Sequence, residues 1–251
     1  MKESRTIPNS LMKYENFTRQ EFEKAMKDSY NLTTPQVSYD LKKQLEQGLI
    51  VRSGWAQYSF SKKRKYSFEY SEQTLNIVNL LSNEFEGLEF QIFELRQLND
   101  FMNHQMAHNT IFVSVENELI KFVFDALWRA FPGKVLLKPK VGDYYRYKQD
   151  DEIVINRLPS ESPKGYEQSW QSRLEKILVD VFTDKLISEI VPEGEKKTII
   201  DGAFEEYLLD VKTMVRYAKR KGAEKKFAQI LEEYGKVTSC RTPYKRTADK
   251  E

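Results

Sequence analysis

The stretch TRQEFEKAMKDSYNLTTPQVSYDLKKQLEQGLIVRSGWAQYSF, residues 18–60, decides the fold of the amino-terminal part of the chain. It opens with Thr18 and has a glutamate three positions later, Glu21, which is the capping-box pattern of a helix start. The apolar residues that follow at helical spacing are Phe22, Ala25 and Met26. This spacing predicts an amphipathic helix that begins at Thr18.

A second helix is predicted directly after the first. Thr34 offers an N-cap hydroxyl, and Pro35 suits the first helical position, where the missing N–H of proline has no cost. The apolar positions that follow recur every four residues: Val37, Leu41 and Leu45. Gly48 supplies the left-handed residue that ends the helix. An earlier helix around residues 7–12, with Ile7, Leu11 and Met12 as its apolar side, would pack against this pair.

After Gly48 the pattern changes to that of two short strands. Residues 49–52 form a β run, Ser53-Gly54 a turn, and residues 55–60 a second strand with Tyr58 and Phe60 on one face. Helix, turn, helix and hairpin in this order are typical of a winged helix-turn-helix. We therefore predict such a domain over residues 1–65, called the head below.

Positive charge is concentrated in the head. It holds 13 Lys and Arg against 7 Asp and Glu, whereas the rest of the chain holds 27 and 31. Such asymmetry favours a polyanionic partner. In a winged helix the second helix enters the major groove, where Gln reads adenine and Lys neutralises phosphates. The candidate DNA-binding residues are Thr34, Gln36, Ser38, Tyr39, Lys42, Lys43, Arg52, Trp55, Lys62, Lys63 and Arg64.

The remainder is predicted to be an α/β (α+β) domain over residues 66–237, called the body, followed by a polar tail at 238–251. Its fold class is a small central sheet with C-terminal helices. Strands are predicted at 88–93, 110–115, 135–137 and 153–155, and helices at 74–82, 118–130, 174–190, 204–221 and 223–234. The short apolar strands are typical of a sheet that helices cover.

No evident catalytic constellation is present, so we expect neither an enzyme nor a cofactor. His104 and His108 have the spacing that places two imidazoles on one helical face, but no third ligand accompanies them, and no metal is expected. Cys240 has no histidine beside it. A restriction-type nuclease needs an acidic residue and an acidic-x-Lys motif to hold Mg²⁺. Residues 137–138 and 152–154 do not supply that motif, although four carboxylates keep the nuclease as an alternative: Glu89, Glu94, Glu116 and Asp143.

Two basic or aromatic segments are candidate partner surfaces. Residues 144–147, Tyr-Tyr-Arg-Tyr, are predicted to form a loop that either meets a partner or packs on the sheet. Residues 216–221 place four cations on the last turns of a helix, where they either satisfy the helix dipole in solvent or bind an acidic partner or nucleic acid.

No membrane segment is expected. The longest apolar run has three residues, whereas a spanning helix needs about 20. The first residues lack the apolar stretch of a secretory signal, so the chain is expected in the cytoplasm.

The order of these segments resembles the AbiEi-like antitoxins of bacterial type IV (abortive infection) toxin–antitoxin systems. The segments that carry the resemblance are residues 17–19, 34–37, 41, 45–52 and 58 in the head and 111–116, 153–155, 160–163, 174–180 and 216–220 in the body. The resemblance implies a transcriptional repressor whose winged helix binds inverted repeats in its own promoter. It also implies a body that opposes a nucleotidyltransferase-like toxin, with no direct contact required and no catalytic residue. The alternatives are a winged-helix-targeted nuclease with a degenerate restriction-like core and a protein-docking scaffold.

Overall fold

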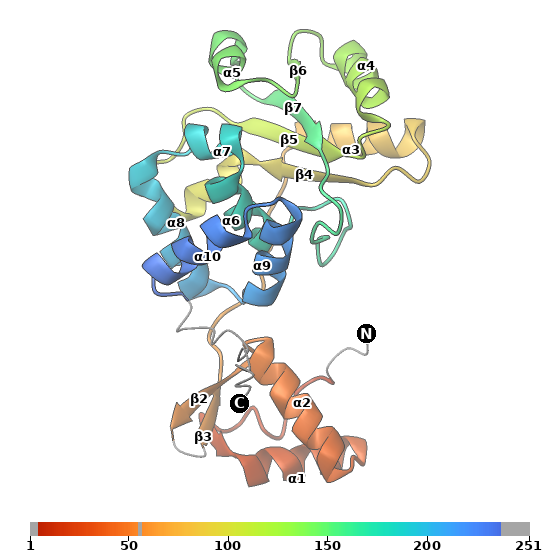
Figure 1. Ribbon diagram of the computed structural model, residues 1–251. Helices are drawn as coiled ribbons and strands as arrows, with labels where there is room; N and C mark the ends of the chain where they lie inside the picture. Colours follow the sequence, from red (N-terminus) through yellow and green to blue (C-terminus); the bar gives the residue numbers. More distant parts are fainter. Residues whose placement is uncertain (1–4, 55–56, 237–251) are drawn as a thin grey trace, which may run out of the picture.

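The protein is a mixed α/β molecule with two small sheets, one in the head and one in the body (Figure 1). The computed structural model describes residues 5–54 and 57–236. The predicted tail, with Cys240, and the candidate residue Trp55 lie outside the described residues. The α/β fold class predicted from the sequence is confirmed.

The head contains two helices and three antiparallel strands. They are β1 (Asn16–Thr18), α1 (Arg19–Tyr30), α2 (Thr34–Glu46), β2 (Ile50–Gly54) and β3 (Gln57–Phe60), with the sheet order β1-β3-β2. The predicted cap of α1 is confirmed, since Thr18 and Glu21 form a capping box. Phe17 of β1 pairs with Tyr58 of β3 and is buried against Phe22, so the sheet and α1 share one core.

Three sequence predictions for the head are wrong in detail. Residues 9–13 form turns rather than a helix, because Leu11 is buried while Met12 is 55% exposed and the segment has no continuous apolar stripe. The N-cap of α2 is Thr33, one residue before the predicted Thr34. Strand β2 continues through Gly54, so the turn does not lie at residues 53–54. Strand β1 was not predicted, because three residues give too short a pattern.

The body is a four-stranded sheet covered by helices on both faces. Its elements are α3 (Glu72–Glu84), β4 (Phe90–Glu94), the 3₁₀ helix η1 (Leu95–Phe101), β5 (Thr110–Val115), α4 (Ile120–Ala130), β6 (Val135–Leu137), α5 (Val141–Tyr147), β7 (Glu152–Arg157), α6 (Leu174–Thr183), α7 (Lys185–Ile190), α8 (Glu193–Glu206), α9 (Val211–Arg220) and α10 (Glu224–Glu233). The strand order is β4-β5-β7-β6, with β4 antiparallel to β5 and the other neighbours parallel. Helices α3 and α4 pack on one face, and α5 with α6–α10 on the other.

The body differs from the prediction at three helices. The single helix predicted at 174–190 breaks at Asp184, whose Oδ1 accepts hydrogen bonds from the backbone N–H groups of Leu186 and Ile187 and so begins α7. The predicted loop 144–147 belongs to α5, because Tyr144 is fully buried and its hydroxyl lies 2.8 Å from Thr110 Oγ1. Helix α8 was not predicted as a separate element, since its apolar residues do not form a clear stripe at helical spacing.

A buried ionic cluster ties α9 to α6. Asp180 is 4% exposed, and its carboxylate accepts hydrogen bonds from Lys176 (2.8 Å) and Lys221 (2.5 Å) and from the Tyr217 hydroxyl (3.2 Å). Burial alone raises the pKa of Asp180, but the two ammonium groups outweigh it and hold the pKa below its ordinary value. The sequence-based expectation of a solvated basic end at 216–221 is therefore wrong for Lys221, and Arg220 forms an ion pair with Glu161.

Asp180→Asn is expected to lower the free energy of unfolding by about 3–5 kcal/mol, because it removes the counter-charge of the buried Lys176 ammonium group. It also removes the nearer carboxylate of Lys221, which is partly buried and keeps Asp184 at 3.8 Å. Urea denaturation at neutral pH measures this loss. The pKa of Asp180 is depressed in the folded state. The difference in the free energy of unfolding between wild type and variant is therefore full above pH ~4, and it shrinks as the pH falls below that value.

The matched control is Glu84→Gln, which removes an exposed ion pair with Arg129 (3.5 Å) and is expected to change stability by less than about 0.5 kcal/mol. Equal effects of the two substitutions contradict a structural role for the buried cluster.

Candidate nucleic-acid interface

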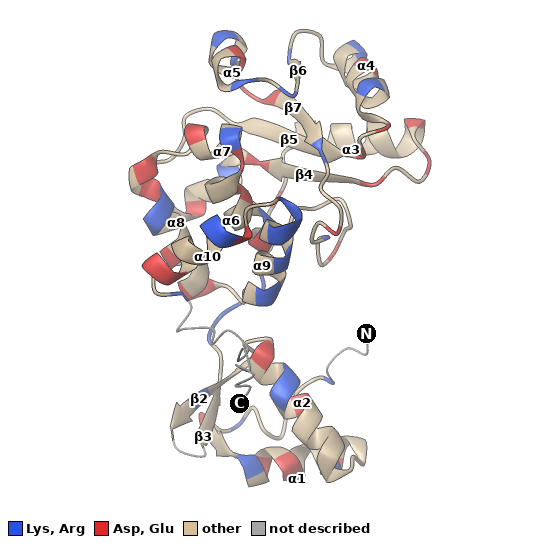
Figure 2. Cartoon of the chain, viewed as in Figure 1, with Lys and Arg blue, Asp and Glu red and all other residues tan. Residues whose placement is uncertain are grey.

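Helix α2 has one buried and one exposed face. Its buried residues are Val37, Asp40, Leu41 and Gln44. On the other side, Tyr39 is 57% exposed and Lys42 is exposed, and Lys43 Nζ lies 5.9 Å from the centre of the Tyr39 ring. Figure 2 shows basic residues on this helix. The predicted residues Tyr39, Lys42 and Lys43 therefore share an accessible surface that carries two positive charges and one phenol hydroxyl.

The amino-terminal end of α2 is held by Gln36. Its Oε1 accepts hydrogen bonds from the Thr33 backbone N–H (2.9 Å) and the Thr33 hydroxyl (3.0 Å). A glutamine reads adenine with both its oxygen and its amide nitrogen, and here the oxygen is already used. The bidentate adenine contact expected from the sequence therefore conflicts with the helix cap, and Gln36 keeps its Nε2 hydrogens as donors.

Side chains of α1 fix two other predicted residues of α2. The Thr34 hydroxyl donates to Glu23 (2.8 Å) and accepts from Lys27 (2.9 Å). Hydrogen bonds from Lys27 and Thr34 lower the pKa of Glu23, so its carboxylate stays ionised. Thr34 is therefore part of the contact between the helices.

Arg19, at the start of α1, donates from Nη2 to Ser38 Oγ (2.9 Å). Ser38 thus brings a guanidinium to the surface formed by α2. The sequence analysis missed Arg19, because 19 positions separate it from Ser38 and only the helix pairing reveals the contact.

The inner face of α2 is fixed by a buried carboxylate. Asp40 is 1% exposed and forms an ion pair with Arg5 (2.8 Å), while Gln44 Nε2 donates to the Arg5 carbonyl (3.0 Å). The segment before β1 is thereby bound along α2. This role of Asp40 was not predicted, since a helical acid is usually a solvent-exposed residue.

The hairpin and the residues after it divide into two groups. Arg52 is exposed on β2, across from Tyr58, and Lys62 and Lys63 are exposed beyond β3. Arg64 is different: its guanidinium contacts the Tyr207 hydroxyl (2.9 Å) and Glu206 (3.1 Å) of the body, and its backbone bonds to the carbonyl of Glu206 and the N–H of Leu208. Arg64 therefore joins the head to the body, a role that the sequence analysis did not predict, and its contact with DNA stays a prediction.

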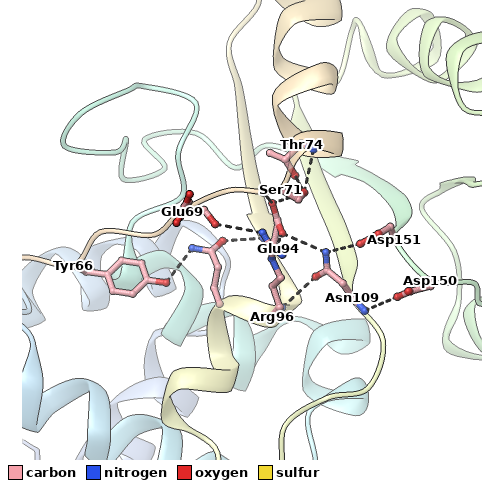
Figure 3. A network of polar contacts seen from close by, with 10 residues as sticks. Tyr66, Glu69, Ser71, Thr74, Glu94, Arg96, Asn109, Asp150 and Asp151 are labelled. Atoms are coloured by element: carbon pink, nitrogen blue, oxygen red, sulfur yellow. Dashed lines mark hydrogen bonds and ion pairs between the residues drawn. The ribbon is translucent and has the colours of Figure 1, made fainter.

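The candidate catalytic carboxylate Glu94 is a structural group. It is fully buried, accepts from the backbone N–H (2.7 Å) and hydroxyl (2.8 Å) of Ser71, and forms an ion pair with Arg96 (2.6 Å), as Figure 3 shows. Asn109 Nδ2 donates to its other oxygen (3.3 Å) and to Asp151 (2.9 Å). Both oxygens of Glu94 are engaged in joining α3, β4 and β5, which explains its burial without a metal.

The other candidate ligands do not gather around one point. Glu89 pairs with Lys164 (2.6 Å) and lies beside Glu116, whose Oε1 accepts from the Glu89 backbone N–H (3.3 Å). Both line a cavity of about 780 Å³ at the carboxyl ends of β5 and β7, whereas Glu94 precedes η1 at the opposite end of the sheet and Asp143 lies in α5. No group of three or more metal-ligating residues is present in the part of the chain that the structure describes.

The histidines do not share a helical face, because residues 102–109 form no helix. His104 Nδ1 bonds to Glu195 (2.8 Å), which lowers the pKa of that carboxyl group, and His108 lies 3.9 Å from Asp150. The two rings therefore do not lie side by side, and each contacts a different segment of the body.

Comparison with known proteins places the chain in a single family. Residues 36–236 match a family of unknown function, DUF6577. No match was found among the curated proteins. Among the described residues, no helix is long and apolar enough to cross a membrane.

Gln36→Ala is expected to lower the free energy of unfolding by about 1 kcal/mol, since the Thr33 N–H and hydroxyl lose their acceptor at the helix end. Gln36→Glu keeps an acceptor oxygen and adds a favourable charge near the helix N-terminus, so it should retain wild-type stability. Thermal unfolding of both variants measures the difference. Equal stability of the alanine and glutamate variants argues against the cap.

Proposed function

The chain belongs to the DUF6577 family, and we propose that it is a DNA-binding transcriptional repressor that uses its head as a winged helix. The observation that carries the proposal is the outward surface of α2. Tyr39, Lys42 and Lys43 are presented there on a helix whose other faces are packed against α1 or the amino-terminal segment.

The proposed surface is preorganised. Thr34 and Ser38 are held by α1, and the Gln36 cap fixes the end of the helix that a winged helix turns toward the bases. A rigid helix loses little conformational freedom when it binds, which favours tight association with a groove of matching shape. Lys42 and Lys43 suit phosphate contacts, and Arg52 in the hairpin suits the adjacent backbone or minor groove.

Lys42→Ala/Lys43→Ala is expected to weaken binding to duplex DNA from the region upstream of the chain's own gene. Removing one lysine–phosphate pair reduces the slope of log affinity against log salt by about 0.9, so the double variant should lower the slope by about 2. Fluorescence anisotropy across a salt series measures both the affinity and the slope.

The matched control is Lys121→Ala/Lys140→Ala, which removes two exposed cations from the end of the body remote from the head (Figure 1). The control should bind like wild type. An unchanged salt slope in the α2 variant, or an equal reduction in the control, rejects the assignment of α2. Equal affinity of wild type for unrelated duplexes rejects a promoter-specific repressor.

We further propose, on the resemblance to AbiEi-like antitoxins, that the body acts against a nucleotidyltransferase-like toxin encoded beside the chain. Because this role belongs to the body, Lys42→Glu/Lys43→Glu is expected to abolish repression of a promoter reporter while still protecting cells that express the toxin. Growth and reporter activity in the same strain measure the two effects. If the variant loses protection as well as repression, the head and the body do not have separate roles. If the neighbouring gene encodes a protein of another class, the proposed antitoxin role is contradicted.

A further inference from the structure

Strand β6 is an open edge of the body sheet. The order β4-β5-β7-β6 gives it one neighbour, β7, with which Val135, Leu136 and Leu137 pair in parallel. Figure 1 shows α4 and α5 on either side of β6, at the end of the body remote from the head. The outer side of β6 is therefore flanked by a helix on each face of the sheet.

The backbone of β6 has donors and acceptors aimed at this opening. Lys134 O accepts from Ile153 N (2.7 Å) and Lys138 N donates to Ile155 O (2.9 Å), which fixes the register with β7. Because the bonding direction alternates along a strand, the N–H and C=O groups of Val135 and Leu137 point away from β7. Within residues 5–54 and 57–236, these four backbone groups therefore have no hydrogen-bond partner. Such an edge is a template for another strand.

The opening is a shallow groove with aromatic walls. Trp128 of α4 is 46% exposed and Tyr147 of α5 is 55% exposed. A cavity of about 450 Å³ lies between them, and its lining is Trp128, Gly133, Val135, Leu136, Arg146, Tyr147, Lys148 and Gln149. Partly exposed aromatic rings beside an unpaired strand supply apolar area for the alternate side chains of an added strand.

Charge selects the occupant of the groove. Among the described residues, its lining contains two cations, Arg146 and Lys148, and no carboxylate. Lys134 and Lys138 directly flank β6 in the sequence. A second copy of this chain paired through β6 would bring these like charges together, which is unfavourable across two adjacent strands. An extended segment rich in Asp or Glu meets the same cations with complementary charge.

We propose that the edge of β6 binds an extended acidic segment of a partner protein as an added strand. The backbone groups of Val135 and Leu137 bind its main chain, Trp128 and Tyr147 contact its apolar side chains, and Arg146 and Lys148 pair with its carboxylates. This site is independent of the proposed DNA contact, since it uses residues of the body alone.

The first experiment uses a fluorescein-labelled peptide of alternating glutamate and valine as the probe. Saturable anisotropy with the full chain is expected. Methylation of the backbone nitrogens on one edge of the peptide should weaken binding about tenfold when that edge faces β6, because it removes main-chain donors while keeping every charge. Absence of saturable binding up to ~1 mM, a range that covers weak peptide complexes, overturns the proposal.

The second experiment changes the chain. Leu137→Pro removes one outward N–H and leaves the bonds of Lys134 and Lys138 to β7 in place. Arg146→Glu reverses one charge of the groove and keeps the backbone edge. Both variants should weaken the peptide complex about tenfold or more, whereas Lys185→Glu on α7, outside the groove, should bind like wild type. Thermal unfolding identifies a misfolded proline variant, and Arg146→Glu then carries the test.

Three further results overturn the proposal. Equal binding of N-methylated and unmodified peptides shows attraction by charge without strand addition. Equal binding of a lysine–valine peptide shows that the cations do not select the partner. Self-association of the chain that the peptide displaces, seen by sedimentation velocity, assigns the edge to a second copy.

Discussion

The packing of α2 between α1 and the amino-terminal segment is the constraint on which the head depends. A short helix with a polar outer face gains little stability alone, so its position comes from tertiary contacts. The ion pair between buried Asp40 and exposed Arg5 fixes one side of α2, and the bonds to Arg19 and Glu23 of α1 fix the other. The outer surface then follows without further adjustment: Tyr39 and Lys42 are exposed on it, with Lys43 beside the Tyr39 ring.

The connection between head and body is also specific. Arg64 bonds through its backbone to the strand-like segment at Tyr207, stacks its guanidinium 4.9 Å from the Tyr207 ring and pairs with Glu206. Glu46 at the end of α2 pairs with Lys212 of α9 (3.1 Å). Arg64, whose place in the basic run after the hairpin suggests DNA binding, therefore also joins the head to the body. The carboxyl end of α2 lies next to α9.

The sequence predicted those elements that depend on contacts between residues close together in the chain. The Thr18 cap and strand β5 were predicted because each depends on residues within a few positions. Errors arose where distant residues decide. Tyr144 becomes helical because its hydroxyl meets Thr110 in the core, and Asp184 breaks a long apolar pattern by capping α7. In the candidate site, the exposure of Tyr39 and Lys42 followed from helical spacing. The Gln36 cap also follows a local pattern, in which Thr33 is the N-cap and Gln36 the third helical residue. The sequence analysis missed it because it placed the N-cap at Thr34, one residue too far along.

The two proposed surfaces are both basic, so charge alone does not separate their ligands. Helix α2 offers side-chain donors on a convex helix, a shape that a groove of nucleic acid accommodates. Strand β6 offers backbone donors alternating with acceptors, and the phosphates of nucleic acid have no N–H to satisfy those carbonyls. Another polypeptide strand satisfies both. Discrimination therefore comes from the pattern of hydrogen-bonding groups, with positive charge serving at both sites to raise the rate of encounter.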